Sequence, residues 1–562
     1  MKDYETVVLD GSGSDNDSDT NNNNNNNNQQ DTYNGVIIDD SNNHHRMITG
    51  GGGRCPMLMN NSNLSLSNTN TIELNINTNN NNNGNEQPTY KTFLKLHRLN
   101  HNITYSNIIG SYLASFLSIC FFVFINVAQP IIITNIFHLD QDNQGAISGD
   151  LTFYNEIVIL ATSHMWGLLS DRFGRRIVYC MGMLLMGAGL VIYPFAEVYY
   201  QLVLFRAVFA LGAAAASSMI SAVLGDYVVF EDRPFASGLL GLSAGFGAVF
   251  GSLALLKMPD FLEQSASMSV TTATQVTYAT TAAMALVGAI ALWFTLQPKA
   301  TICNINTVID RGISSYGQPL FTEHVKHIYG LAREGILAAR NPILSVAYGS
   351  GFLARGDSAI ATTFLSLWIY SYDLNVNGGN KAAALAKSGT ITGIAQTCGL
   401  VFAPIAGLLA SKIGRLRAMV LIAAFGALGY FILAFSDSPL TPLFLVASCI
   451  IGCTETGMVV SSTALVAQES PANCRGSVGG IFSLFGAVGI LVAAKIGGIW
   501  YDHWNGFPFA LFGGFSIILV IWGIVVEIYV TIKKNRGEKI PNDSSSLVEE
   551  DQDQNPLLSK LK

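Results

Sequence analysis

The sequence has few charged residues. Asp, Glu, Lys and Arg together make up 12% of its 562 positions, whereas hydrophobic residues make up 49%. This charged fraction is about half that of an ordinary soluble domain, and a single aqueous core could not hide so much apolar surface. A bilayer would absorb the surplus, so the composition excludes an ordinary soluble protein and predicts a membrane protein.

Several functional signatures are missing as well. The eight cysteines have no CxxC spacing and mostly fall inside apolar stretches, so we interpret them as packing residues. A basic patch with interleaved aromatic residues is absent, which excludes nucleic-acid binding. Neither a nucleophile with a base, nor a metal-ligand cluster, nor a phosphate-binding loop stands out, and His164 is isolated. We therefore expect no enzyme activity, no cofactor and no metal site.

Both ends of the chain are polar. Residues 1–88 are rich in Asn, Asp, Ser and Thr, with Asn runs at 21–28 and 79–83. Such a segment buries too little apolar area to offset its ordering entropy, so the sequence predicts a disordered, low-complexity tail. It also lacks the apolar core of a signal peptide, and we expect the first membrane helix to direct insertion. Residues 533–562 form a second predicted disordered tail.

Between the tails, mainly apolar runs of about 20 residues recur, the length that crosses about 30 Å of hydrocarbon. The sequence therefore predicts an all-α membrane protein with twelve transmembrane helices. Their expected spans are 107–135, 146–168, 176–196, 200–224, 235–257, 273–296, 343–370, 384–409, 416–436, 442–466, 476–500 and 508–530.

Lys and Arg set the predicted orientation. They cluster before the first span and after the second, eighth and twelfth, whereas the loops at 138–142 and 436–439 carry almost none. Because cytoplasmic loops carry the excess of basic residues, we expect both termini in the cytoplasm. Residues 298–341 then form a cytoplasmic linker between two six-helix halves, 89–297 and 342–532.

The two halves share a sequence repeat. The segment GLLSDRFGR at 167–175 recurs as GLLASKIGR at 407–415, an offset of 240 residues. The tetrapeptide FGAV occurs at 246–249 and again at 485–488, an offset of 239 residues. Two matches at nearly one offset predict parallel, pseudo-symmetric halves with a substrate site between them.

Three motifs resemble those of the major facilitator superfamily. The loop GLLSDRFGRR at 167–176 is similar to the signature loop of that family. Arg206 with Gly212 in the fourth span, and EDRPFASG at 231–238, are similar to two further family motifs. The resemblance covers residues 90–535 and implies a transporter whose central cavity is lined by the first, fourth, seventh and tenth spans.

The resemblance also implies a cytoplasmic charge latch that biases the outward-open state. In this latch Asp171 would cap the eleventh span, and Arg175 would reach Asp226 at the end of the fourth. The residues assigned to the latch are Gly167, Asp171, Arg172, Gly174, Arg175, Asp226, Gly407, Gly414 and Arg415.

The fifth span departs from the drug antiporters of the family. Those proteins usually carry a Gly-Pro-x-x-Gly-Gly element there, whereas GLSAGFGAVFG at 241–251 contains no proline. This difference argues against a drug antiporter. We interpret the glycines as allowing close packing on a neighbouring helix.

Five charged residues lie inside predicted spans: Glu156, Arg206, Arg355, Asp357 and Glu455. A charge at the centre of a membrane helix costs at least about 2.5 kcal/mol, so each is a candidate for substrate binding or coupling. By the resemblance, Arg206, Arg355 and Glu455 surround the central cavity. We consider a Glu455–Arg355 pair, with a static pair that only neutralises two costly charges as the alternative.

Arg355 lies about 18 Å along its helix from the expected cytoplasmic boundary, near the membrane midplane. Tyr348 shares its helical stripe, which we interpret as facing the cavity. Asp357 points about 200° away from Arg355. Either Asp357 faces a neighbouring helix, or the helix loosens at Gly356.

Glu156 has a neutral counterpart in the second half, Gln396, at the same offset of 240 residues. A carboxyl group in a low dielectric can exchange protons near neutral pH, so this asymmetry indicates a proton site in the first half. The alternative is that Glu156 only pairs with Arg206 in a structural role.

The C-terminal tail carries a candidate sorting signal. Asp553 stands four residues before the pair Leu557 and Leu558, within an acidic run. The pattern resembles the acidic dileucine signal that coat adaptors bind on endosomal and lysosomal proteins. We therefore expect a coat adaptor as a partner, and favour an endosomal or lysosomal membrane over the plasma membrane.

Together these features predict a secondary active transporter that moves a small organic solute by alternating access, with proton symport or antiport. Its expected partners are the lipid bilayer, a small-molecule substrate and protons. Two alternatives stay open. One is an organic-anion uniporter or exchanger in which Arg206 and Arg355 bind the solute, and the other is a non-transporting receptor or partner subunit with a transporter fold. The few pocket side chains do not identify the substrate.

Overall fold

The computed structural model describes most of the chain between Thr92 and Arg536. The described stretches are 92–93, 97–100, 102–136, 143–229, 232–298, 335–376, 380–470 and 475–536, with Arg333 and six short strands nearer the N-terminus. The chain divides into two compact units, Met1–Thr89 and Tyr90–Lys562.

The first unit holds six short strands that form one sheet. They are β1 (Tyr4–Val8), β2 (Thr32–Tyr33), β3 (Val36–Asp39), β4 (His44–Thr49), β5 (Ser62–Leu66) and β6 (Thr71–Ile76). The strand order is β2-β3-β4-β1-β6-β5, and β1 is parallel to β4 and antiparallel to β6. The expected disorder of residues 1–88 stays a prediction.

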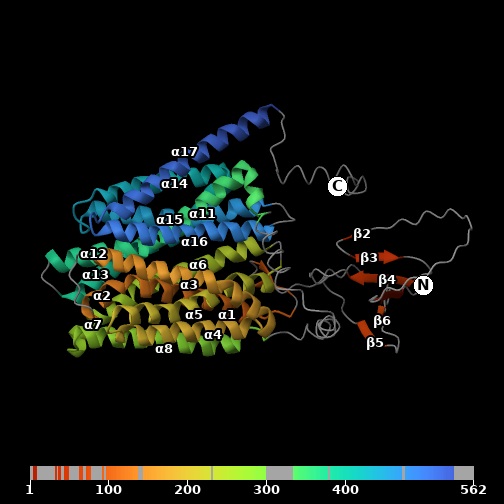
Figure 1. The fold of residues 1–562 in the computed structure, drawn as a ribbon, viewed down its shortest axis with the longest axis horizontal. Coiled ribbons are helices and arrows are strands. Elements are labelled where there is room, and N and C mark those ends of the chain that lie inside the picture. Colours follow the sequence, from red (N-terminus) through yellow and green to blue (C-terminus); the bar gives the residue numbers. More distant parts are fainter. Residues whose placement is uncertain are drawn as a thin grey trace, which may run out of the picture. The chain divides into compact units, whose positions relative to one another are not determined.

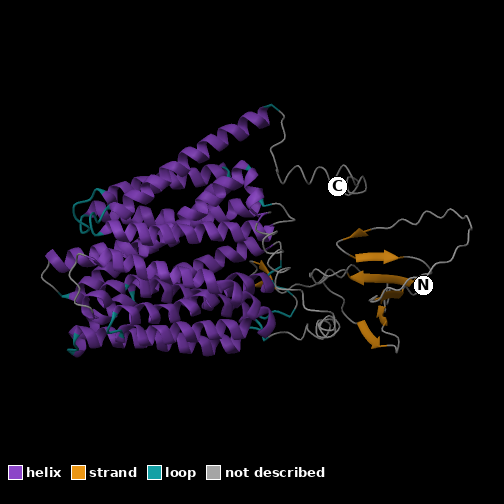
Figure 2. Cartoon of the chain, viewed as in Figure 1, coloured by secondary structure: helices purple, strands orange, loops and turns teal. Residues whose placement is uncertain are grey.

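The second unit begins with a two-stranded pair and continues as helices (Figure 2). The pair is β7 (Thr92–Phe93) and β8 (His97–Arg98). The α-helices of the first half are α1 (Tyr105–Val127), α2 (Gln129–Ile136), α3 (Gln144–Phe173), α4 (Arg175–Ile192), α5 (Tyr199–Tyr227), α6 (Arg233–Leu253), α7 (Met258–Ala266) and α8 (Val270–Thr295). Short 3-10 turns lie at Tyr193–Phe195 and Leu255–Lys257.

The second half repeats this arrangement. After a 3-10 turn at Ala338–Arg340, its helices are α11 (Pro342–Ala359), a π-helical segment Ile360–Phe364, α12 (Leu365–Val376), α13 (Lys381–Ile413), α14 (Arg415–Ala434), α15 (Pro442–Glu469), α16 (Arg475–Tyr501) and α17 (Phe507–Asn535). Figure 1 shows the helices running side by side along their length, those of the first half in orange to yellow-green and those of the second in green to blue.

Ten helical stretches among the described residues are long and apolar enough to cross a membrane. The two other predicted spans, 146–168 and 343–370, coincide with α3 and with α11 through α12. These two are less apolar or interrupted, because α3 contains Glu156 among other charges and the α11 helix gives way to a π-helical segment at Ile360. Twelve spans and cytoplasmic termini therefore stay predictions, while the mostly helical membrane fold is present.

Local sequence signals explain where the helices begin and turn. Thr104 and Asn107 form a reciprocal capping box at the start of α1, and Pro442 occupies the first turn of α15. Gly174 and Gly414 each join two helices at φ 97°, a conformation that a side chain disfavours. The sequence repeat thus corresponds to a repeat in backbone geometry.

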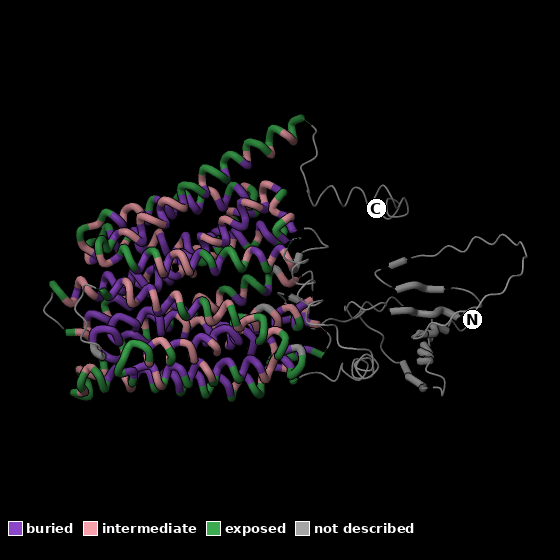
Figure 3. The backbone as a smooth tube through the Cα atoms, in the orientation of Figure 1, coloured by how far each residue is buried: buried purple, intermediate pink, exposed green. Residues whose placement is uncertain are grey.

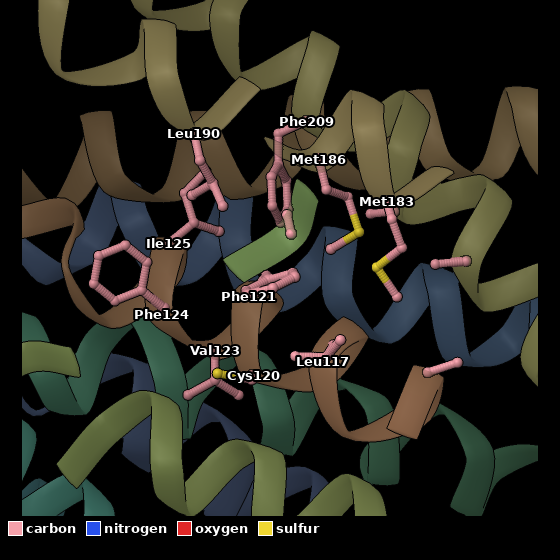
Figure 4. Packing of buried hydrophobic residues seen from close by; sticks show 14 of the residues in the cluster. Leu117, Cys120, Phe121, Val123, Phe124, Ile125, Met183, Met186, Leu190 and Phe209 are labelled. Atoms are coloured by element: carbon pink, nitrogen blue, oxygen red, sulfur yellow. The ribbon is translucent and has the colours of Figure 1, made fainter. Parts of the chain in front are cut away.

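Each half has its own apolar core. Buried residues lie where helices face one another, while many outward faces are exposed (Figure 3). In the first half, Phe121 and Leu117 of α1 lie near Met183 and Met186 of α4 and near Phe209 of α5 (Figure 4). The second cluster is built from α11 to α17.

Glycines allow the backbones of α1 and α6 to touch. A Cβ added at Gly247 would lie 2.1 Å from the Phe116 carbonyl oxygen, and one at Gly251 would lie 2.7 Å from that of Cys120. The close packing that the glycine-rich fifth span predicts is therefore present.

Two helix pairs join the halves, α3 with α16 and α6 with α13. At Gly149 of α3, an added Cβ would lie 2.2 Å from the Ala494 carbonyl oxygen of α16. At Gly389 of α13, it would lie 2.6 Å from the Ser252 carbonyl oxygen of α6. The halves therefore approach to backbone contact along these two seams.

The halves are tied together by polar contacts near one end, which we call the closed end. The Thr134 and Tyr370 hydroxyls lie 2.6 Å apart, and Ser366 Oγ donates to the Val127 carbonyl oxygen at 2.9 Å. Lys381 Nζ donates to the Thr134 carbonyl oxygen at 3.0 Å. These contacts connect the α1–α2 segment with α12 and α13.

A second group of contacts at the closed end joins α3 to α16. Asp502 accepts hydrogen bonds from the backbone amides of Gly145 at 2.7 Å and Ala146 at 2.9 Å, so it caps the first turn of α3 from the other half. Lys495 Nζ lies 2.6 Å from Asp150 Oδ1. We call these contacts of Asp502 and Lys495 the α3–α16 clasp.

The opposite end, which bears Gly174 and Gly414, is the open end. A Cβ added at Gly167 or Gly407 would meet no atom within 4 Å. The neighbouring Leu168 and Leu408 side chains are 73% and 62% exposed. At Gly167 and Gly407 the helices therefore have no close neighbour, unlike at the glycines where the two halves touch.

Candidate functional site

Arg206 of α5 is fully enclosed, with 1% of its surface exposed. Its Nη1 donates to Gln129 Oε1 at 2.9 Å, and its Nη2 donates to Asn126 Oδ1. Its guanidinium carbon also lies 5.8 Å from the ring centre of Tyr193. A buried cation needs such partners to replace water, so the end of α1 and the start of α2 hold Arg206. Among the described residues, Arg206 forms no ion pair with Glu156. The Glu156–Arg206 pair that the sequence suggested as an alternative is therefore not formed.

Glu455 of α15 is bound through both of its carboxylate oxygens. Oε1 accepts from Ser358 Oγ of α11 at 2.6 Å, and Oε2 accepts from Gln396 Nε2 of α13 at 3.0 Å. The residue is 9% exposed. The considered Glu455–Arg355 pair is not formed, because neutral donors from two other helices occupy the carboxylate instead.

Asp357 lies on the other side of α11. Its Oδ1 accepts a hydrogen bond from the Tyr430 hydroxyl of α14 at 2.7 Å, and 2% of the residue is exposed. Of the two alternatives for Asp357, the structure has the one in which it faces a neighbouring helix. The α-helix continues through Gly356 and changes to π-helix only at Ile360.

Arg355 differs from these residues because its side chain is exposed. It projects from α11 and passes close to Gly486 of α16. A Cβ added at Gly486 would lie 2.7 Å from the Cγ of Arg355. Its charge acts on the carboxyl group of Glu156 on α3, which is 5% exposed. Arg355 of the second half and Glu156 of the first half therefore lie near enough for their charges to interact.

Tyr348 does not line this space. Its hydroxyl donates to the Gly335 carbonyl oxygen at 2.7 Å, its ring stacks on Phe485 at 5.6 Å between centres, and 3% of the residue is exposed. Helical spacing from Arg355 suggested a cavity-facing residue, but α16 covers this turn of α11.

The signature loop has part of the geometry that the resemblance implies. Arg175 Nε lies 3.0 Å from Asp226 Oδ2 of α5. In the second half, Arg415 Nη1 donates to the Ala464 carbonyl oxygen of α15 at 2.8 Å. Both contacts stay within one half and are formed while this end is open, so neither holds the halves together. The Asp171 side chain lies outside the described residues, and the latch role stays a prediction.

Sequence reasoning missed several residues of the site. Asn126, Gln129 and Tyr430 are neutral, and a neutral polar residue in a span does not carry the energetic signal of a charge. The run Asn126 to Pro130, which places two amide side chains just before a proline, could have indicated the Arg206 site. Lys495 received no role from its sequence, yet it contacts Asp150 across the halves.

The fold, two helical halves that each enclose charged residues, is that of a multi-pass membrane transporter. The family model of the Major Facilitator Superfamily matches residues 111–331 and 347–557. The chain belongs to this superfamily.

Curated relatives support the same assignment. Magnetosome protein MamH of Paramagnetospirillum magneticum is 25% identical over 404 residues, which cover 70% of this chain and 85% of MamH. Magnetosome protein MamZ of the same organism is 23% identical over 405 residues, 70% of this chain and 58% of MamZ. The chain thus spans somewhat more than half of MamZ.

Solved transporter structures share the fold. The nucleoside transporter NupG aligns with a TM-score of 0.54 at 14% identity, over 75% of this chain and 98% of NupG. The inward open conformation of the xylose transporter XylE from E. coli aligns with a TM-score of 0.54 at 16% identity, over 74% of this chain and 94% of XylE. At this identity the likeness concerns the fold alone.

Proposed function

We propose that this protein is a secondary active carrier that moves a small organic solute by alternating access and couples the movement to protons. The observation that supports the proposal is Glu156 of α3, a buried carboxyl group that lies near enough to Arg355 of the other half for the two charges to interact. A buried carboxyl group opposite a cation is a chemically suitable proton site, because taking up a proton removes its attraction to that cation.

Alternating access requires that one end open while the other closes. Here the closed end holds Thr134, Tyr370 and the α3–α16 clasp, while the signature loops lie at the open end. In the orientation that Lys and Arg predict, the open end is cytoplasmic, and this is an inward-open state.

Uptake into proteoliposomes, with and without an imposed pH gradient, tests the coupling. Solutes would first be selected from a metabolite pool by thermal stabilisation of the purified protein. We expect the gradient to accelerate uptake by the native protein but not by Glu156→Gln, with Asp437→Asn in an exposed loop as the control. Gradient-independent uptake, unchanged in Glu156→Gln and Glu455→Gln, would overturn the coupling.

An organic-anion uniporter or exchanger is the second candidate. The exposed side chain of Arg355 favours it, whereas Arg206 is enclosed by Asn126 and Gln129 and does not meet a solute. Uptake of an anion at equal rates with and without a pH gradient would select this candidate. A solute that stabilises the protein but is never translocated would instead select a receptor.

We also propose that the protein resides in an endosomal or lysosomal membrane, and that a coat adaptor binds the sorting signal in its C-terminal tail. The support is the sequence signal formed by Asp553, Leu557 and Leu558, which lies outside the described residues. A tagged chain with Leu557→Ala and Leu558→Ala should then accumulate at the plasma membrane, whereas an unchanged distribution would contradict the signal.

A further inference from the structure

We infer that the transported solute carries a negatively charged group that binds Arg355, and that Gly486 of α16 positions the Arg355 side chain for it. The inference rests on the proposed carrier function and adds the chemical class of the substrate, a small organic anion such as a carboxylate. It also assigns a role to Gly486, which lies in the second copy of the FGAV repeat.

Exposure separates Arg355 from the other charged groups of the site. Arg206, Asp357, Glu156 and Glu455 are 1%, 2%, 5% and 9% exposed, whereas Arg355 is exposed. Among these five charged residues, Arg355 is therefore the one with an exposed surface that a solute can contact. A guanidinium presents a planar set of N–H donors that matches carboxylate and phosphate oxygens.

Arg355 lies near an acidic residue without contacting it. No carboxylate oxygen lies within 4.0 Å of its guanidinium among the described residues. Its charge nevertheless acts on Glu156 from the other half, and Ser358, one turn further along α11, binds Glu455. The guanidinium thus keeps donors available for a ligand, while Glu156 competes with that ligand for the same cation.

Gly486 explains why the side chain takes this direction. A Cβ at this position would lie 2.7 Å from Arg355 Cγ and 3.4 Å from Arg355 Cβ, so any larger residue must displace the stem. The equivalent glycine of the first half, Gly247, instead faces the Phe116 carbonyl oxygen at 2.1 Å. The repeated glycine thus allows close backbone packing in the first half, whereas in the second half it leaves room for the aliphatic part of the Arg355 side chain.

The class of substrate is tested with a cell metabolite extract divided by ion exchange into anionic, neutral and cationic pools. Each pool is tested for thermal stabilisation of the full-length purified protein and for uptake into proteoliposomes. We expect the stabilising, transported solutes in the anionic pool. Transported solutes found only in the neutral or cationic pools would overturn the inference but leave the carrier function intact. Absence of transport from every pool would overturn the carrier function and this inference with it.

Variants then test the two residues against the anionic solute. Arg355→Gln should weaken binding at least about tenfold, the effect of losing a charged hydrogen bond, and Arg355→Lys should retain part of the affinity. Gly486→Ala should raise KM with little change in maximal rate. Gly480→Ala on the same helix is the control, because a Cβ there meets no atom within 4 Å.

Unchanged affinity in Arg355→Gln would overturn the assignment of the anion site. If Gly486→Ala lowers only the yield or melting temperature and leaves KM at the Gly480→Ala value, Gly486 is a packing residue and its positioning role is wrong. Measuring both KM and the melting temperature therefore distinguishes a role of Gly486 in positioning Arg355 from a role in folding.

Discussion

At the scale of single residues, the site consists of charges whose partners are mostly neutral. Arg206 is bound by two amides, Glu455 by a hydroxyl and an amide, and Asp357 by a phenol. Neutral donors and acceptors satisfy a buried charge without neutralising it. Removing one partner therefore leaves the other unsatisfied.

Asp357 allows this reasoning to be tested. We expect Asp357→Asn to fold and transport, because the amide oxygen can still accept from the Tyr430 hydroxyl. Asp357→Leu leaves that hydroxyl buried without an acceptor and should lower stability by about 1–3 kcal/mol. Melting temperatures of the two purified variants make the comparison. Loss of transport in a well-folded Asp357→Asn protein would instead place Asp357 in the transport mechanism.

The sequence could identify the charged residues of the site but not their partners. Each charge in a span is costly enough to be noticed on its own, which made Glu156, Arg355 and Glu455 candidates for substrate binding or coupling. Their partners depend on which helices become neighbours. Tyr348 shows the limit of such reasoning. It lies on the same face of α11 as Arg355 by helical spacing, but α16 covers it, because its ring stacks on Phe485.

At the scale of helices, close packing depends on particular glycines and not on glycine content. Gly247→Ala would bring a methyl group to the Phe116 carbonyl oxygen, and we expect a loss of about 1–3 kcal/mol. Gly241→Ala is a matched control on the same helix, since it meets nothing within 4 Å. Melting curves of both variants in detergent give the answer, and equal melting temperatures would contradict the packing.

The α3–α16 clasp should stabilise the closed end. Asp502→Ala removes the cap of α3, which is worth about 1 kcal/mol. The population in which the closed end has opened should therefore rise about fivefold. Ser366→Cys, at a position that is fully buried between the halves, reports this opening by its rate of alkylation. Asp437→Ala in an exposed loop is the control. An alkylation rate in Asp502→Ala equal to that of the control would show that the clasp has no such effect.

The order and approximate bounds of the helices follow from the sequence, because apolar runs of membrane length are separated by glycine, proline and polar residues. The paired turns at Gly174 and Gly414 also follow from the repeat. The π-helical segment Ile360–Phe364 does not, since it contains no proline or glycine that would mark it; in the structure it packs against α1, α3 and α16.

At the scale of the whole molecule, two similar halves meet along α3–α16 and α6–α13 and differ in what their equivalent positions do. Glu156 corresponds to Gln396, and Gly247 to Gly486. The repeat predicts the architecture, and equivalent positions of the two halves nevertheless differ in their side chains or contacts. The conformational state could not be predicted, because it depends on the small difference between contacts at the two ends.

Distances between the halves test the central claim, a carrier that alternates between open ends. Spin labels on Leu168→Cys and Leu408→Cys report the open end, and labels on Tyr200→Cys and Val376→Cys report the closed end; all four positions are exposed. Double electron–electron resonance in lipid would measure the distance within each labelled pair, first with Asp502 intact and then with Asp502→Ala added. We predict a new population with a shorter 168–408 distance and a longer 200–376 distance. Distances that stay unchanged at both ends, or that lengthen together, would contradict alternating access.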